Sequence, residues 1–218
     1  MESPDIAKNV RDGYDAIAQQ YMELVTAPRV SDPRSAWINE FLGRLSDGSH
    51  VLDLGCGPGV PTAAAFVRNG HRVTGIDISP RQVELARVNV PPGRFLIGDA
   101  LTTNFPSGSF DAIAALFVLT HLPRDQWAWL FARFVEWLSP QGWLLATFGM
   151  NDSSGWDEED FLGFGHTNWT NGYGPDTSRR LLVDAGGPGQ MCNAVAHEDW
   201  RARASQSDEP GHRRRTGW

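Results

Sequence analysis

A short apolar run that ends in closely spaced glycines constrains this chain more than any other feature. The segment Val51–Gly59 reads VLDLGCGPG, and a helix-forming stretch, Pro61–Asn69, follows it. Glycines at positions 55, 57 and 59 allow the backbone to turn sharply and to approach a bound group closely. The N–H groups at the start of the next helix favour negative or electron-rich groups. The segment predicts a buried strand, a glycine turn and a helix, although a tight structural turn alone would also use glycines.

Short apolar strands alternate with helical segments over most of the chain. The first part of the chain, up to about Leu45, has helical spacing of its apolar residues. The expected strands are His50–Leu54, Arg72–Asp77, Phe95–Ile97, Phe110–Leu116 and Trp143–Phe148. The expected helices between and after them are Pro61–Asn69, a helix opened by Ser79 and Pro80, Trp127–Leu138 and Asp176–Ala185. This alternation predicts an α/β fold of three layers, with a mainly parallel sheet between helices.

Two carboxylates follow neighbouring strands of this expected sheet. Asp77 ends the second strand, twenty residues after Gly57. Asp99 follows the third strand and precedes the apolar Ala100. A carboxylate at the first place can accept bonds from both hydroxyls of a ribose, and one at the second from the edge of an adenine. Taken singly, Asp77 could cap the helix that begins after Ser79, and Asp99 could lie in a solvated loop; together they predict an adenosine site.

The spacing of the glycines disfavours a dinucleotide cofactor. Dinucleotide-binding turns follow the pattern G-x-G-x-x-G, or the same pattern with a final alanine. Counted from Gly55 the last position is Val60, and counted from Gly57 it is Thr62. A β-branched side chain there would crowd the helix against the strand, so nicotinamide or flavin binding is not expected.

These motifs resemble those of a known enzyme family. DLGCGPG at 53–59, VTGIDIS at 73–79 and GDA at 98–100 are similar to the motifs of class I S-adenosylmethionine-dependent methyltransferases, as are YDAIAQQY at 14–21, FDAI at 110–113 and LSPQGW at 138–143. The resemblance spans roughly Tyr14 to Gly186. It implies a Rossmann-like sandwich that binds S-adenosylmethionine and releases S-adenosylhomocysteine. It does not identify the methyl acceptor.

The resemblance also implies roles for individual residues. The methionine part of the cofactor would be held by the strand end and the turn, at Asp53, Gly55, Cys56, Gly57 and Gly59. The adenosine part would be held at the next two strand ends, by Asp77, Ile78, Asp99 and Ala100. The backbone carbonyl of Leu116 would take the methionine ammonium. Tyr14 or Tyr21 would cover the methionine end, unless these two rings belong to the core.

Two histidines are candidate bases for methyl transfer. The reaction is an in-line displacement in which the protein mainly aligns the reacting groups, and a hydroxyl acceptor also needs a base. His121 follows the fourth strand, and His166 lies in a later segment rich in glycine and aromatic residues. His121 could instead bond a backbone carbonyl to shape its loop, and His166 could be an exposed loop residue. No metal site is expected from the composition.

The segment 150–175 has weak periodicity and is long for a connection, which is typical of a lid or a substrate-binding segment. Its aromatic residues could wall a pocket or pack among themselves: Trp156, Phe161, Phe164, Trp169 and Tyr173. After it, residues 187–218 lack Leu, Ile and Phe. We therefore expect an irregular tail beyond a methyltransferase domain at 1–186, with the family's usual C-terminal β-hairpin missing or altered and a five-stranded sheet left with an open edge.

Charge and composition favour a small-molecule acceptor. The formal net charge is -7, which disfavours nucleic acid, and the basic cluster Arg213–Arg215 is typical of a solvated tail. The Asn/Asp-Pro-Pro-Tyr/Phe stretch of enzymes that methylate amino groups of DNA adenine or glutamine is absent after the fourth strand. Two alternatives remain: a methyltransferase that acts on a macromolecule, and a cofactor-binding member of the fold with impaired catalysis. With two cysteines, no signal peptide and no apolar stretch of spanning length, a cytoplasmic monomer or homodimer without membrane contact is expected.

Overall fold

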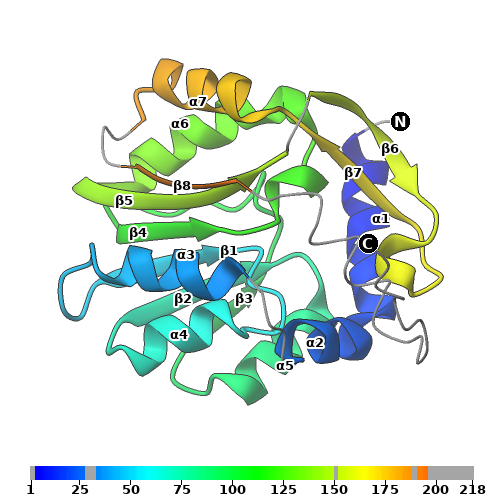
Figure 1. Ribbon diagram of the computed structural model, residues 1–218, viewed down its shortest axis with the longest axis horizontal. Helices are drawn as coiled ribbons and strands as arrows, with labels where there is room; N and C mark the ends of the chain where they lie inside the picture. The colour runs from blue at the N-terminus through cyan, green and yellow to red at the C-terminus, as the bar shows by residue number, and fades with distance from the viewer. Residues whose placement is uncertain (1–2, 28–32, 150–151, 188–190, 196–218) are drawn as a thin grey trace, which may run out of the picture.

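The computed structural model describes residues 3–27, 33–149, 152–187 and 191–195 (Figure 1). Its α-helices are α1 (Ser3–Ala16), α2 (Ala18–Thr26), α3 (Pro33–Leu42), α4 (Thr62–Arg68), α5 (Pro80–Asn89), α6 (Trp127–Trp137) and α7 (Pro175–Asp184). Its strands are β1 (His50–Leu54), β2 (Arg72–Asp77), β3 (Arg94–Ile97), β4 (Phe110–Ala115), β5 (Leu138–Phe148), β6 (Ser153–Glu158), β7 (Asn168–Gly172) and β8 (Met191–Val195). Short 3-10 turns are η1 (Leu119–His121), η2 (Arg124–Gln126) and η3 (Phe161–Gly163).

A parallel sheet of six strands forms the middle layer, in the order β3-β2-β1-β4-β5-β8. The central strand β1 pairs with β2 on one side and with β4 on the other, so Leu52 lies between Thr74 and Ile113. The chain winds outward from β1 in one direction and from β4 in the other. A sheet of this kind leaves a crevice at the carboxyl ends of the two central strands, where ligands bind.

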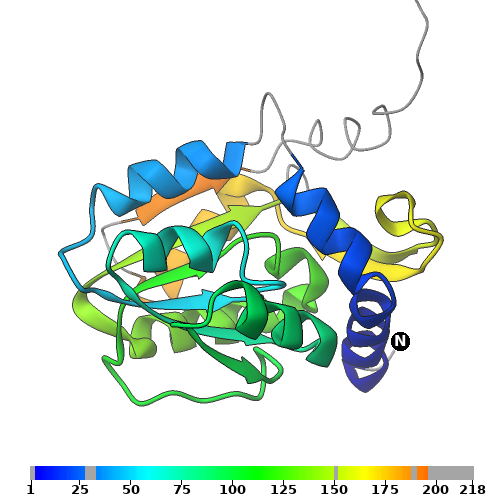
Figure 2. The ribbon, with the colours of Figure 1, turned by 90° about the horizontal axis from the view of Figure 1, so that it is seen from below.

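Helices cover both faces of the sheet (Figures 1 and 2). The helices α3, α4 and α5 pack on one face, where Phe41 and Phe66 are fully buried. The helices α6 and α7 pack on the other, and α6 presents a stripe of buried residues at helical spacing: Trp127, Leu130, Phe131, Phe134 and Trp137. The predicted three-layer α/β sandwich is confirmed, because each apolar helix face has one face of the sheet to cover.

The elements that do not belong to the sandwich lie at the carboxyl ends of its strands. There α1 runs beside the hairpin of β6 and β7, which pair antiparallel (Figure 1). The described part of the segment 150–175 therefore has secondary structure of its own. Its periodicity is weak in the sequence because the pairing of β6 with β7 is irregular between Ser153 and Trp156.

The strand β8 corrects the expectation for the end of the chain. It pairs in parallel with β5, from Leu144 opposite Met191 to Phe148 opposite Val195. The prediction of a five-stranded sheet that ends at β5 is therefore wrong. The strand reads MCNAV and is short, so its apolar residues are not visible in the composition of residues 187–218 as a whole. Within the described residues after α7 this strand is parallel, so the usual hairpin is not seen there; residues 188–190 and 196–218 of the expected tail lie outside the described residues.

No helix in the described part of the chain has both the length and the apolar character needed to cross a membrane.

Candidate cofactor and active site

A cavity of about 410 Å³ opens at the carboxyl ends of β1, β2 and β4, between them and α1. Its volume lies in the range of small-molecule sites. Most of the residues predicted from the sequence line it: Tyr14, Tyr21, Gly55, Gly57, Asp77, Ile78, Asp99, Ala100, Leu116 and His121. The strands therefore bring together side chains that are distant in the sequence.

The glycine turn after β1 is built so that the backbone itself forms the cavity wall. Gly55 has φ of 70°, and a Cβ atom there would lie 2.6 Å from the Cβ of Val118. The backbone N–H groups of Gly55 and Cys56 both donate to the carbonyl of Ile76, which ties the turn to β2. A side chain at position 55 would therefore both strain the backbone and displace the segment after β4.

Asp77 links this turn to the start of α5. Its Oδ2 accepts from the backbone N–H of Gly57 at 2.8 Å, and its Oδ1 accepts from the N–H of Ser79 at 2.9 Å. The helix itself is capped by Ser79, whose Oγ accepts from the N–H of Gln82. Each carboxylate oxygen can accept two hydrogen bonds, so Asp77 keeps capacity for the two hydroxyls of a ribose while it holds the turn in place.

Asp53 lies behind the turn and does not itself line the cavity. It is 2% exposed, and its Oδ2 has no hydrogen-bond partner. Burial, and then the neighbouring charge of Asp77, raise the pKa of Asp53 to about 7. Burial also raises the pKa of Asp77 to about 6. The buried Asp53 and the half-buried Asp77 thus lie close together, and a cationic group such as an ammonium beside them would favour their ionised forms.

The side of the cavity beyond β3 combines one carboxylate with apolar surface. Asp99 is half-buried, and its Oδ1 accepts from the N–H of Leu101 at 2.8 Å, which fixes its orientation. Ile78, Ala100 and Leu101 line the cavity beside it. Asp99 is therefore a cavity residue rather than part of a freely solvated loop, and the set fits a flat ring with an amino group on its edge.

His121 and Tyr14 form a hydrogen-bonded pair at the cavity. The Nε2 atom of His121 lies 2.9 Å from the hydroxyl of Tyr14, and its Nδ1 lies 2.8 Å from the backbone carbonyl of Trp169. A carbonyl only accepts, so Nδ1 carries the proton, and in the neutral ring Nε2 accepts from Tyr14. The carbonyl bond considered as an alternative role for His121 is thus present, and it orients the ring toward Tyr14.

Aromatic packing holds this pair. Phe161 lies edge-on to both rings, at 5.6 Å from Tyr14 and 5.5 Å from His121, and Tyr21 lies edge-on to Tyr14 at 5.3 Å. Trp169 forms an apolar cluster with Ile6 and Val10, and Tyr14 and Ile78 pack against this cluster. Of the aromatic residues in the segment 150–175, Phe161 and Trp169 pack with residues that line the cavity. Tyr173 instead packs on Trp127. The side chain of Trp156 lies outside the described part.

Other predicted residues do not line the cavity. His166 is exposed and lies at a separate surface hollow beside Lys8 and Asp12. Cys56 is buried behind the turn, where burial raises the pKa of its thiol well above the usual range. A Cβ at Gly59 would approach Val90 and Ala86 at 3.1 and 3.3 Å, so this glycine permits close packing of α5.

Sequence reasoning missed part of the lining. Ile6 and Val10 line the cavity from α1, two turns and one turn before Tyr14 respectively. The spacing i, i+4, i+8 of Ile6, Val10 and Tyr14 is a sequence signal that predicts this shared helix face.

Phe117 and Gln126 also line the cavity. Phe117 has a φ of 61°, and its N–H donates to Thr147 Oγ1 at 2.6 Å. A strained residue of this kind follows from tertiary packing and has no sequence signal. In the described residues no group of three or more side chains suited to a metal ion is found.

Comparison with known proteins agrees with this geometry. The model of a methyltransferase domain family matches residues 51–142, and that of protein-L-isoaspartate(D-aspartate) O-methyltransferase matches residues 6–95. Residues 51–142 thus match the methyltransferase domain family, although neither of the two matching models covers half of the chain. Both matches include β1, the glycine turn and Asp77 of this methyltransferase domain. Neither reaches β6 and β7, so the family models carry no information on that hairpin.

Individual relatives show how far the similarity extends. A trans-aconitate 2-methyltransferase of Shigella flexneri is 36% identical over 156 residues, 70% of this chain and 59% of that protein. A phosphoethanolamine N-methyltransferase of Plasmodium falciparum is 33% identical over 119 residues, 53% of this chain and 45% of that protein. The chain thus spans less than two thirds of the curated relatives it matches.

Solved structures share the fold. The 1,6-didemethyltoxoflavin-N1-methyltransferase of Burkholderia thailandensis superposes with a TM-score of 0.64 at 22% identity, covering 85% of this chain and 79% of that one. That structure contains its acceptor and S-adenosylhomocysteine. At this identity the match shows a common fold and leaves the acceptor of the present chain to be argued from its own residues.

Proposed function

We propose that this chain is an enzyme that binds S-adenosylmethionine and transfers its methyl group to a small-molecule acceptor. The observation that carries the proposal is that the Tyr14–His121 pair lines the same cavity as Asp77 and Asp99. The bound cofactor supplies an electrophilic methyl group on a sulfonium. One cavity thus provides both a place for an adenosine and a group that can accept a proton from an acceptor.

The residues fit the cofactor in separate parts. Asp77 accepts from the ribose hydroxyls with the lone pairs that Gly57 and Ser79 leave available. Asp99 accepts from the adenine amino group, between the apolar Ile78 and Ala100. At the methionine end, the glycine turn, Tyr21 and the carbonyl of Leu116 line the space, and the buried Asp53 supplies negative charge behind it. Asp53, Cys56 and Gly59 support this end from behind rather than by contact.

The Tyr14–His121 pair provides the acid–base chemistry. As the acceptor attacks, its O–H or N–H proton passes to the Tyr14 hydroxyl oxygen while the Tyr14 proton passes to Nε2 of His121. The imidazole ends protonated, and the carbonyl of Trp169 continues to accept from its Nδ1. A positioned base contributes about 10²- to 10⁴-fold to a rate. His166 takes no part in this scheme, because it lies at another surface hollow.

A small acceptor is favoured over a macromolecule. Helix α1 forms one wall of the cavity and is itself packed against Phe161 and Trp169, so a bulky acceptor that needs a wider opening would have to displace these contacts. The names of the relatives are those of small-molecule methyltransferases. The match to the protein-methylating family ends at residue 95, within the cofactor half, and carries no argument about the acceptor. The net charge of -7 disfavours nucleic acid. A cytoplasmic monomer or homodimer remains our expectation.

The test has two stages. Calorimetric titration with S-adenosylmethionine and S-adenosylhomocysteine should give saturable binding, with one site per chain. Transfer of a labelled methyl group to a panel of small hydroxyl, amine and acidic C–H compounds should then give a labelled product that His121→Asn does not form. Absence of binding would overturn the proposal entirely. Binding without transfer to any small molecule, but with label on a protein or nucleic acid, would favour the macromolecular alternative.

A further inference from the structure

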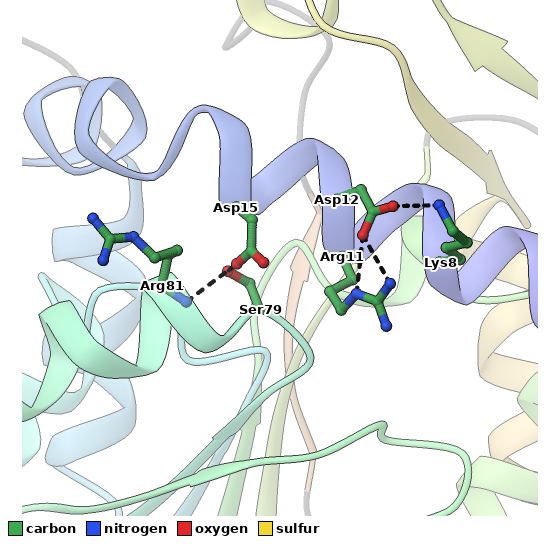
Figure 3. A network of polar contacts seen from close by, with 6 residues as sticks. All are labelled: Lys8, Arg11, Asp12, Asp15, Ser79 and Arg81. Atoms are coloured by element: carbon green, nitrogen blue, oxygen red, sulfur yellow. Dashed lines mark hydrogen bonds and ion pairs between the residues drawn. The ribbon is translucent and has the colours of Figure 1, made fainter.

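Two consecutive residues of helix α1 make contacts in different parts of the molecule. Tyr14 bonds to His121 at the cavity, whereas the next residue, Asp15, bonds to the start of α5 (Figure 3). One carboxylate oxygen, Oδ1, accepts from the hydroxyl of Ser79 at 2.5 Å and from the backbone N–H of Arg81 at 3.1 Å. A carboxylate is favoured beside the N-terminus of a helix, where backbone N–H groups lack partners.

The other charged residues drawn on α1 do not connect it to the body of the protein. Lys8 and Arg11 both bond to Asp12 within the same helix, and all three side chains are largely exposed. Figure 3 shows the contrast, since Asp12 lies among its helical neighbours and Asp15 points to α5. Exposed ion pairs of this kind contribute little to docking. Asp12 is therefore a natural control for Asp15.

The Asp15 contact joins a continuous path to the cofactor-binding turn. Ser79 donates its hydroxyl to Asp15 and its backbone N–H to Asp77, and Asp77 in turn accepts from the N–H of Gly57. Both ends of the path line the cavity, through Tyr14 on α1 and through Asp77 with Gly57. The position of α1 is thus fixed relative to the residues assigned to the ribose.

We propose that Asp15 is a positioning residue, which fixes α1 on the N-terminus of α5. This contact holds Tyr14 in hydrogen-bonding distance of His121. It also keeps the α1 residues that line the cavity beside the bound cofactor. The inference rests on the proposed function for its kinetic consequences. The docking itself does not depend on any ligand and can be tested without one.

Hydrogen exchange of the free protein tests the docking. Asp15→Ala removes both acceptor bonds, Asp15→Asn keeps an oxygen at Oδ1, and Asp12→Ala removes a carboxylate from the same helix. We expect amides of α1 to exchange at least about tenfold faster in Asp15→Ala, and within about threefold of wild type in the other two variants. Unchanged exchange in α6 shows that the variants are folded. Equal exchange in Asp15→Ala and Asp12→Ala would overturn the proposal, as would equal loss of protection in Asp15→Asn and Asp15→Ala.

Kinetics test the positioning role. In Asp15→Ala the Kd for S-adenosylmethionine should rise about tenfold and kcat should fall about tenfold, with recovery in Asp15→Asn and no change in Asp12→Ala. A merely structural defect would lower the active fraction, and so kcat, while Kd and KM stayed constant, and that result would overturn the role. If wild type binds no cofactor, the proposed function fails, whereas the exchange result on α1 still decides the docking.

Discussion

The two sides of the cavity are built in different ways. On the cofactor side, the residues between Val51 and Ala100 follow one another along β1, β2 and β3, and backbone N–H groups make most of the fixed contacts. On the acceptor side, Tyr14, His121 and Trp169 come from α1, η1 and β7 and meet only through tertiary packing. The cofactor side is therefore specified by local sequence. The acceptor side can change with any of three distant segments, which suits a fold in which the donor is constant and the acceptor varies.

The largest expected effect tests the acceptor side. His121→Asn keeps an amide N–H that can donate to the carbonyl of Trp169, but it removes the base. We expect kcat to fall about 10³-fold, since a positioned acid–base group contributes about 10²- to 10⁴-fold. Single-turnover methyl transfer to the acceptor found in the panel measures it, with calorimetry as a check that the Kd for the cofactor stays within about threefold.

A double-variant cycle sharpens this test. If Tyr14 and His121 act as one unit, Tyr14→Phe combined with His121→Asn should be little worse than the more damaging single variant. Losses that simply multiply would mean that the two residues act separately. A kcat for His121→Asn within about tenfold of wild type would remove His121 from the catalytic assignment.

The same division explains what the sequence could predict. That the glycine turn, Asp77 and Asp99 meet at one cavity is predictable from the sequence, because parallel strands end at the same edge of a sheet and position along the chain therefore implies position in space. Tyr14 and His121 were named separately, but their contact, across 107 positions, follows from the docking of α1 and was not foreseen. His166 illustrates the limit of this reasoning, because a loop histidine has no periodicity that sets its direction. The strand β8 was missed because its pairing with β5 depends on an available edge and not on its own pattern.

The next effect tests the cofactor side. Asp77→Ala removes the acceptor of two ribose hydroxyls and of two backbone N–H groups that hold the turn. Hydrogen bonds to a charged group contribute about 1.5–3 kcal/mol each, so the Kd for S-adenosylmethionine should rise by at least about a hundredfold. Glu84→Gln is the matched control, because Glu84 is exposed on α5 and pairs only within that helix, with Arg81. Titration calorimetry measures both, and a change below about tenfold in Asp77→Ala would contradict the ribose assignment.

A smaller effect concerns the stability of the turn. Gly55→Ala combines a left-handed backbone with a Cβ that would lie 2.6 Å from that of Val118. The backbone term is about 1–2 kcal/mol and overpacking adds about 1–3 kcal/mol, so we expect a loss of about 3 kcal/mol in the free energy of unfolding. Gly108→Ala has a similar φ of 67° with no atom within 4 Å of its Cβ, so it should lose only the backbone term. Urea denaturation compares them, and equal midpoints would show that contact with Val118 is unimportant.

The smallest effect is a pH dependence that arises from Asp53. Its pKa is raised to about 7 in the folded protein, from 3.8 when it is exposed, so the folded state keeps a proton that the unfolded chain has already released between these values. Raising the pH through this window therefore lowers stability, and the loss is complete above about pH 7. Asp53→Asn cannot lose that proton. Its Tm should rise relative to wild type between pH 5 and pH 8, by an amount that corresponds to at most about 3 kcal/mol, because two pKa units lie between pH 5 and the folded pKa of about 7 and each is worth about 1.4 kcal/mol.

We expect cofactor binding to change the titration of the same carboxyl group. A cationic ammonium in front of the glycine turn stabilises the ionised form of Asp53 and so opposes the pH effect in the complex. Thermal unfolding of wild type and Asp53→Asn, each with and without saturating S-adenosylmethionine, separates the two contributions. We expect the difference between the variants to depend on pH in the free proteins and to become nearly constant in the complexes. Parallel dependence of Tm on pH in the two free proteins from pH 5 to pH 8 would instead mean that Asp53 does not titrate in this window without the cofactor, and would contradict the raised pKa.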